Sequence, residues 1–252
     1  MNRLSVFVLF VCLSIPIYPQ TAPSVLVPHI AVGDSWKTTF RVRNPRAGLQ
    51  EVKIEVFDVS GAPLPVDING QRSTARTFVV PAANLFDIKL ALPGGVVTGF
   101  ARMTFLSGLS LPYILFYSDF LGREGAISKA TQGGDFATDT IYFDNVDGAS
   151  TGIAFNYAAH WSVGQTEQVV CYGPDGVQVD SYSFFVPPSG LAAGTVTIRQ
   201  TSFDLESKLP GTAKTFGYCR FFYTNYTGQT TADSHQALSL RFYKNSFIPL
   251  SQ

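Results

Sequence analysis

The sequence predicts an all-β protein built from two tandem antiparallel β-sandwiches. The first observation is composition: 21 Phe and 11 Tyr stand beside 22 Gly and 15 Pro, which is typical of strands joined by tight turns. The second is periodicity, because several segments alternate apolar and polar residues and none carries a sustained, capped helical pattern. The third is length, since 252 residues suit two domains of about 100 to 120 residues each.

The strands are expected in this order. Residues 36–44 alternate apolar with polar side chains, and residues 52–57 do the same before a turn at 58–61. Further alternating runs cover 86–92, 99–105 and 113–117. Six to eight short strands per copy indicate an antiparallel sandwich, with a barrel as the alternative.

An internal repeat divides the chain. Gly33 and Gly148 lie 115 positions apart. The same offset pairs Ser35 with Ser150, Phe40 with Phe155, Gln50 with Gln165, and Gly61 with Gly176. We therefore expect a first sandwich over residues 22–128, a linker over 129–138 and a second sandwich over 139–252. The copies meet in a Gly-containing stretch at residues 122–134, which is either a linker or, at residues 125–130, a short edge strand.

The N-terminus predicts export. Arg3 precedes an apolar stretch at residues 4–17 that is too short to span a bilayer but has the length of a signal-peptide core. We expect a signal peptide over residues 1–21 and a secreted, periplasmic or cell-surface protein with no membrane span in the mature chain. A retained membrane anchor is one alternative. A lipid anchor on Cys12 is the other, disfavoured by Val11 where such sites have a small residue.

The cysteines beyond the leader, Cys171 and Cys219, occupy the repeat positions of Val56 and Ala101. All four positions are expected on the apolar faces of strands. Two inward positions of one sandwich can approach within bridging distance, and an exported protein meets oxidising conditions. A Cys171–Cys219 disulfide and two separate buried thiols therefore remain the two readings.

The chain resembles an uncharacterised family of secreted bacterial (acidobacterial-type) tandem β-sandwich modules. The resemblance rests on VLVPHIAVGDSWKTTFRVRNP (25–45), VFDVSGAPL (56–64), SFFVP (183–187) and LSLRFYKNSFIPL (238–250), and it covers essentially the whole mature chain. It implies an immunoglobulin-like fold in tandem behind a signal peptide, and it supplies no catalytic residues. The second copy departs most, with Thr151 where the first has Trp36.

No segment predicts a metal or cofactor site. His29, His160 and His235 are scattered without metal-ligand spacing. Residues 144–148 (DNVDG) are oxygen-rich like a calcium loop but lack a downstream Glu, so a simple turn is favoured over calcium. The balance of 18 basic and 18 acidic residues argues against a nucleic-acid partner.

The function is predicted by elimination. No nucleophile or phosphate-binding motif occurs, so a non-catalytic exported structural or adhesive cell-envelope module is expected, with a protein or a cell-surface glycan as partner. A carbohydrate-binding module is the first alternative, and an exposed aromatic row near Asp, Asn or Gln would favour it. Its candidate aromatics are Trp36, Trp161, Tyr157, Tyr223 and Tyr226, of which Trp161 is the best and Trp36 is expected in the core. A glycoside hydrolase with a carboxylate pair between the copies is the second alternative function.

Overall fold

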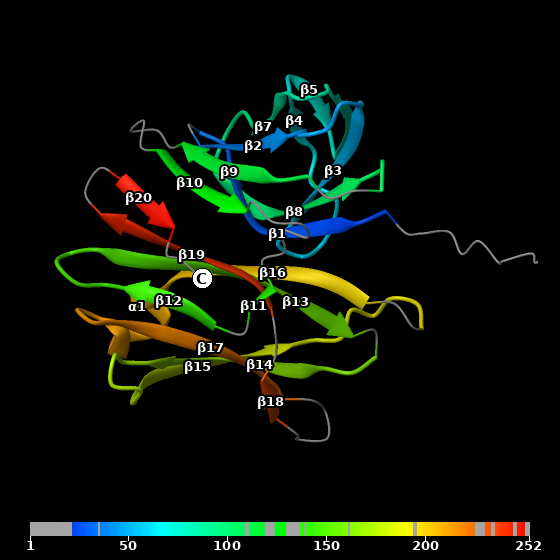
Figure 1. Ribbon diagram of the computed structural model, residues 1–252. Coiled ribbons are helices and arrows are strands. Elements are labelled where there is room, and N and C mark those ends of the chain that lie inside the picture. The colour runs from blue at the N-terminus through cyan, green and yellow to red at the C-terminus, as the bar shows by residue number, and fades with distance from the viewer. Residues whose placement is uncertain are drawn as a thin grey trace, which may run out of the picture.

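The computed structural model describes residues 22–34, 36–108, 111–118, 124–129, 137–138, 140–160, 162–193, 196–224, 230–232, 235–243 and 246–249. It is all-β, as predicted, with antiparallel sheets that form two pairs. Figure 1 shows the pair from the first half of the chain above and the pair from the second half below. Within the described residues, no helix has the length and apolar character needed to cross a membrane.

The upper pair contains ten strands. One sheet has the order β1 (Ser24–Val32), β8 (Val97–Phe105), β3 (Gln50–Asp58), β6 (Ala75–Val80). The other has the order β10 (Glu124–Lys129), β9 (Tyr113–Ser118), β2 (Lys37–Arg43), β7 (Leu85–Ala91), β4 (Val66–Ile68), β5 (Gln71–Ser73). Strand β10 lies where the sequence left open a linker or an edge strand at residues 125–130, and it pairs with β9 along its whole length, so the edge strand is the correct alternative.

The lower pair follows a similar plan. One sheet has the order β11 (Ala137–Thr138), β19 (His235–Tyr243), β13 (Ser150–His160), β16 (Val196–Asp204), with β20 (Ser246–Pro249) also on β19. The other has the order β12 (Thr140–Asp144), β17 (Phe216–Thr224), β14 (Gln165–Tyr172), β15 (Gln178–Val186), with β18 (Thr230–Ala232) also on β17.

The strand order corrects the immunoglobulin-like expectation. In an immunoglobulin sandwich the first strand lies beside the second in one sheet. Here β1 pairs with β8, β2 with β7, β3 with β6 and β4 with β5, all antiparallel, so the chain is wound as one long hairpin. That nested pairing is the wrapping of a jelly roll, with β9 and β10 added beside β2.

The lower pair repeats this order with one replacement. Strands β12, β17, β14 and β15 stand in the order of β1, β8, β3 and β6, and β19, β13 and β16 in the order of β9, β2 and β7. The β4–β5 hairpin has no described counterpart between β14 and β15. Instead a short helix α1 (Leu205–Lys208) and a 3₁₀ turn η1 (Pro210–Thr212) lie between β16 and β17, and they bury Leu205 and Leu209 in the lower core.

Each pair of sheets encloses an apolar core. Phe40, Val42 and Leu115 are fully buried in the upper one, and Phe155 and Phe221 in the lower one. Trp36 packs against the upper core, as expected. Three side chains of the lower pair, Ala154, Leu238 and Leu240, join the upper core cluster. The outer face of β13, β16 and β19 therefore packs on the upper pair.

Candidate functional site: an open aromatic sheet face

The two cysteines form a disulfide inside the lower sandwich. Cys171 on β14 lies directly opposite Cys219 on β17, and both are 0% exposed. Val56 and Ala101 are opposite each other in the same way on β3 and β8. Complete burial against apolar neighbours leaves this bond a structural cross-link rather than a reactive group.

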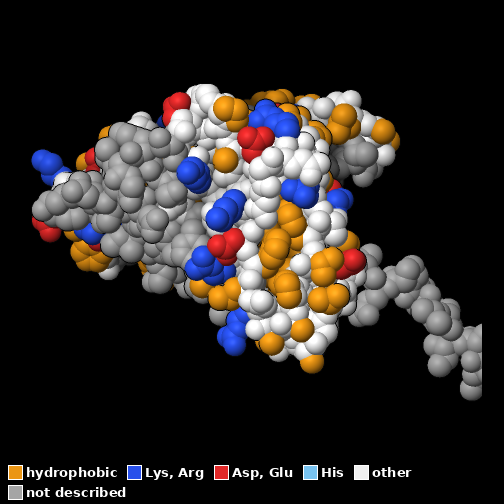
Figure 2. Space-filling model, turned by 90° about the horizontal axis from the view of Figure 1, so that it is seen from above, with side chains coloured by type: hydrophobic (Ala, Val, Ile, Leu, Met, Phe, Trp, Pro, Cys, Tyr) orange, Lys and Arg blue, Asp and Glu red, His pale blue; other side chains and the backbone are white. Residues whose placement is uncertain are grey.

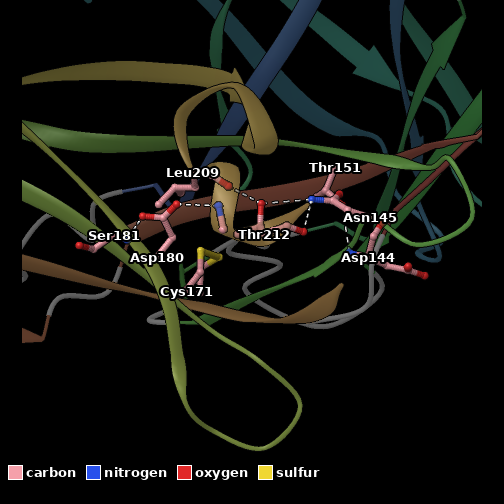
Figure 3. Close-up of a disulfide and its surroundings, with 10 residues drawn as sticks. Asp144, Asn145, Thr151, Cys171, Asp180, Ser181, Leu209 and Thr212 are labelled. Carbon is pink, nitrogen blue, oxygen red and sulfur yellow. Dashed lines mark hydrogen bonds between the residues drawn. A yellow bond between two sulfur atoms is a disulfide. The ribbon is translucent and has the colours of Figure 1, made fainter. Parts of the chain in front are cut away.

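Figure 3 shows how the segment beside the disulfide is held. The Gly211 backbone N–H donates to the Asp180 carboxylate (2.8 Å), which ties η1 to β15. The Asn145 amide donates to the Thr212 carbonyl (3.2 Å) and hydroxyl (3.3 Å), which ties η1 to the β12–β13 turn. These hydrogen bonds hold η1 against the strands beside the disulfide.

The loop at residues 144–148 is the segment where the sequence favours a simple turn over a calcium site. The Asp144 carboxylate accepts the Val146 N–H (3.2 Å) and lies 3.0 Å from the Arg241 guanidinium. Asp147 and Gly148 have φ of 55° and 76°. These contacts describe an Asx-type turn. Within the described part of the chain, no group of three or more His, Cys, Asp or Glu side chains is arranged to hold a metal ion.

A shallow pocket of about 220 Å³ lies between the two sheet pairs, where the hydrolase alternative would place its carboxylates. Asp204 is the one acidic residue among its described lining residues, and its carboxylate caps α1 by accepting the Ser207 N–H (3.2 Å). Burial lowers the pKa of His29 to about 4, and its Nδ1 lies 3.3 Å from the Tyr117 hydroxyl. The described lining therefore supplies no carboxylate pair.

The predicted ligand-facing aromatic, Trp161, lies outside the described residues, as does Tyr226. Tyr157 packs between Phe155 and Phe184 at the lower core, with ring centroids 6.3 Å and 5.4 Å away. The structure therefore does not assemble an aromatic platform from the described members of the predicted set. It assembles one from other residues.

The open aromatic face is the outer surface of the sheet β12-β17-β14-β15. Along these strands the inward residues Ile141, Cys171 and Cys219 alternate with outward neighbours. Tyr142 is opposite Tyr218, and Tyr218 is opposite Tyr172, so three tyrosines form one row across three adjacent strands. The face also carries Phe216, Arg220, Phe222, Gln168, Gln178, Ser183 and Phe185.

The face is exposed at several positions, while Tyr172 and Tyr218 are half-buried and the outward Val170 is buried. Tyr142 is 48% exposed, Phe216 52% and Phe185 65%. In Figure 1 strands β17, β14 and β15 lie on the side of the molecule away from the upper pair, with β18 below them. A large exposed apolar patch usually marks an interaction site. Its described Tyr and Phe residues and Arg220 are types enriched at the centre of protein interfaces, and Asp144, which pairs with Arg241, lies at its edge opposite Phe216.

The rings stand on the sheet rather than lie flat on it. The Tyr172 and Tyr218 centroids are 5.1 Å apart with 19° between the ring planes. Coplanar rings lying side by side could not approach so closely, so the ring faces overlap each other. Neighbouring strands are about 4.8 Å apart, which matches this stack. Tyr172 and Tyr218 therefore turn their stacked ring faces toward each other and present ring edges and hydroxyls outward.

The matching face of the upper pair has the same construction but is covered. Phe57 and Phe100 stack across β3 and β8 (5.0 Å, 17°), and the Arg102 guanidinium lies 5.4 Å from the Phe57 centroid. Phe100 is 1% exposed. The Gln200 backbone N–H and side-chain amide, on β16, donate to the carbonyls of Val59 and Pro28 (3.0 Å each). In the upper pair this face is the surface that docks the two sheet pairs together.

The opposite outer face of the upper pair, formed by β2 and β7, is charged. Arg41 binds the Asp87 carboxylate in a bidentate pair (2.8 Å each), and Lys37, Arg43 and Lys89 are exposed. Figure 2, which views the molecule from above, shows Lys and Arg side chains spread over that surface. The two ends of the stacked molecule thus differ, one aromatic and one charged.

The sequence signal for the aromatic face was present. Tyr142, Tyr172 and Tyr218 each sit one residue from a buried neighbour, at positions that alternation places outward. The chain matches no protein-family model and no curated protein sequence. The resemblance to secreted bacterial sandwich modules therefore stays a prediction.

Proposed function

We propose that this chain is an exported, non-catalytic structural or adhesive module that docks on a protein surface through the open aromatic face. The observation that carries the proposal is the pair of equivalent faces. The Phe57–Phe100 face of the upper pair is buried against another β-sheet, while the Tyr172–Tyr218 face of the lower pair has the same construction and is open.

The proposal treats the two sheet pairs as tandem copies of one module, and local geometry supports this. Gly99 and Gly217 each lie where a Cβ would overlap a carbonyl oxygen of the neighbouring strand, that of Phe57 or Tyr172. Both copies also fasten their first turn with a threonine. Thr38 Oγ1 accepts from and donates to the Ala31 backbone (3.0 and 2.8 Å), and Thr151 does the same with Asp144 (3.0 and 3.1 Å).

Those threonines refine the alignment of the copies. Thr38 and Thr151 are 113 positions apart, whereas Gln50 and Gln165, which begin β3 and β14, keep the offset of 115. Thr38 to Gln50 spans 12 positions and Thr151 to Gln165 spans 14, so β13 and the β13–β14 connection contain the two additional residues. A shift of two preserves which face each side chain occupies, so the copies keep the same inward pattern.

A protein partner fits the face better than a flat glycan. Sugar rings stack on exposed aromatic faces, whereas Tyr172 and Tyr218, at the centre of the row, cover each other's faces. The phenol hydroxyls and ring edges match a protein surface, where Tyr supplies apolar area with a polar tip. Gln168 and Gln178 beside the row favour the carbohydrate alternative, so the experiment includes it.

Export is part of the proposal. Its sequence basis is the predicted signal peptide over residues 1–21. The Cys171–Cys219 disulfide supports it, because such bonds persist in oxidising compartments and are rare in the cytosol.

The test is a quantitative binding assay of the labelled, purified protein on cell-envelope fractions, either untreated, protease-treated or stripped of polysaccharide. We expect saturable binding that protease treatment abolishes and that Tyr218→Arg weakens at least tenfold. Leu85→Arg, at a 55% exposed position on β7, is the matched control and should bind normally. Binding that survives protease but not polysaccharide removal would install the carbohydrate alternative. Equal binding by both variants would remove the aromatic face from the function.

A further inference from the structure

The pocket between the two sheet pairs has an apolar floor. Its floor is the outer face of β13 and β19, where Ala154, Leu238 and Leu240 are at most 5% exposed. The Phe242 ring lies against the backbone of Gly152 and gives the pocket an aromatic wall. Figure 1 shows β1 at the lower side of the upper pair, above β16 and β19, with which it is in contact. Pockets at such contacts between folded units are common sites for small ligands.

The upper pair contributes one polar side chain to this pocket, that of His29 on β1. The Tyr117 hydroxyl donates to the His29 carbonyl (2.8 Å), and its oxygen lies 3.3 Å from His29 Nδ1. A hydroxyl has one proton, so toward Nδ1 this oxygen acts as the acceptor, and in the neutral imidazole the ring proton sits on Nδ1. The other nitrogen, Nε2, is then a hydrogen-bond acceptor. Among the residues that the structure describes, none is its partner.

The charge of the lining selects a neutral ligand. Burial lowers the pKa of His29 to about 4, so its ring is uncharged at neutral pH. The described lining contains no Lys or Arg, and a bound carboxylate or phosphate would lose hydration without gaining a counter-charge. Asp204 is exposed and already caps α1, and an exposed carboxylate adds little to the binding of a cation.

The size of the pocket selects a small molecule. An apolar cavity of about 150 Å³ holds benzene, so 220 Å³ suits one ring with one or two small substituents. The apolar floor matches the ring, and a ligand that brings no donor would leave Nε2 without a hydrogen bond. Ser202, on the opposite strand β16, adds a hydroxyl to the lining.

We infer that this pocket binds a small, neutral phenol-type compound, whose hydroxyl donates to His29 Nε2 while its ring packs on Leu238, Leu240 and Phe242. Such a ligand contacts both sheet pairs, so it stabilises their docking by mass action. The site lies away from the open aromatic face, and this inference does not depend on the proposed function.

Ligand-observed NMR titration of the intact purified protein at pH 7 tests the inference with three probes that share one ring and one methyl group. They are para-cresol, para-xylene, which lacks the hydroxyl, and para-toluate, which is an anion. With each probe at up to about 1 mM, we expect saturable binding of para-cresol and no saturable binding of para-toluate. His29→Phe should weaken para-cresol binding at least fivefold and change para-xylene binding less than twofold.

Two further variants locate the site. Ser202→Phe fills the pocket and should abolish the binding of para-cresol and para-xylene alike. Tyr218→Arg, on the open aromatic face, is the matched control and should bind both probes normally. Circular dichroism checks that each variant is folded. Nitrogen NMR of His29 in the unmodified protein gives a reading that needs no variant, since its Nε2 resonance should shift with para-cresol and stay unchanged with para-xylene.

The contrary results are equally definite. Absence of saturable para-cresol binding, or tighter binding of para-toluate, overturns the inference. Equal losses of para-cresol and para-xylene in folded His29→Phe, or an unchanged Nε2 resonance, would show that His29 is not the acceptor. Normal binding by folded Ser202→Phe would place the probes outside the pocket. None of these results bears on envelope binding through Tyr218, so the two proposals fail separately.

Discussion

The effect of the disulfide on stability can be predicted, because the upper sandwich shows which residues occupy the same two positions without a cross-link. The double variant Cys171→Val with Cys219→Ala copies the pair that occupies the matching positions in the upper sandwich, Val56 opposite Ala101. Both upper residues are 0% exposed, as are both cysteines. The exchange therefore keeps an apolar pair at a buried cross-strand position and removes mainly the cross-link.

The magnitude follows from the loop that the bond closes. The two cysteines are separated by 48 positions, and the chain-entropy estimate for a loop of that length is about 4 kcal/mol at 25 °C. Repacking of Val and Ala against the lower core should change this by no more than about 1.5 kcal/mol. We expect the double variant to fold and to lose about 3 to 5 kcal/mol in its free energy of unfolding.

Urea unfolding followed by tyrosine fluorescence and circular dichroism measures the difference, with the slope checked for a change in the unfolded state. The double variant Cys171→Ser with Cys219→Ser is the contrast. It should be less stable still, because two buried hydroxyls lose hydration without gaining partners. A Val/Ala variant within about 1 kcal/mol of the oxidised protein would refute the cross-link argument.

Three further predictions concern single positions. The pKa of His29 is lowered from 6.5 to about 4, so the unfolded chain binds the extra proton as the pH drops through this range, and the free energy of unfolding should fall by roughly 2 kcal/mol at pH 5. His29→Gln should flatten this part of a curve of urea midpoint against pH, and an unchanged curve would contradict the assignment. Gly217→Ala should lower the free energy of unfolding by about 2 kcal/mol, measured by heat or urea, because the added Cβ meets a backbone carbonyl. Gly48→Ala, with open space around it, should lower it by less than about 0.5 kcal/mol, and equal effects would refute the close-approach argument. The fully buried Asn44 amide donates to three backbone carbonyls, so Asn44→Asp should lower the free energy of unfolding by about 3 kcal/mol or more. Asn84→Asp, at an exposed position, should leave stability nearly unchanged, and a stable Asn44→Asp protein would show that the site is hydrated.

Much of the fold followed from local pattern. The alternation over residues 36–44 predicted β2, whereas the Gly-containing segment near residue 125 left a linker and the edge strand β10 as alternatives. The helix α1 was missed because four residues are too few for a helical period. Its start is nevertheless marked by Asp204, whose side chain caps it, and its end by the Pro210–Gly211 pair.

The strand order could not be obtained in the same way. Pairing of β1 with β8 joins Val27 to Ala101 across more than half of the first copy, and alternation is equally satisfied by an immunoglobulin order and by a jelly-roll order. Local sequence determines which residues face inward, and the partner of each strand depends on the global winding of the chain.

The candidate site also has a part that local sequence predicts and a part that depends on the global arrangement of the chain. Alternation places both Tyr218 and Phe100 outward, yet Phe100 is buried against the lower copy and Tyr218 belongs to an open face. The difference arises from how the two copies stack, and the local sequence around each residue does not determine that stacking. The cysteine pair was the opposite case, because the repeat register alone placed both cysteines on inward strand positions.

The central claim is that the outer face of β12, β17 and β14 is the docking surface. Hydroxyl-radical footprinting with mass spectrometry, read at Tyr142, Tyr172 and Tyr218 in the free protein and in the bound protein, tests it most directly. The buried Tyr113, which is 2% exposed, gives the internal reference. Our account predicts that oxidation of the three tyrosines falls sharply on association while the exposed Leu85 is unaffected. Protection at Leu85 with the three tyrosines unchanged would contradict it.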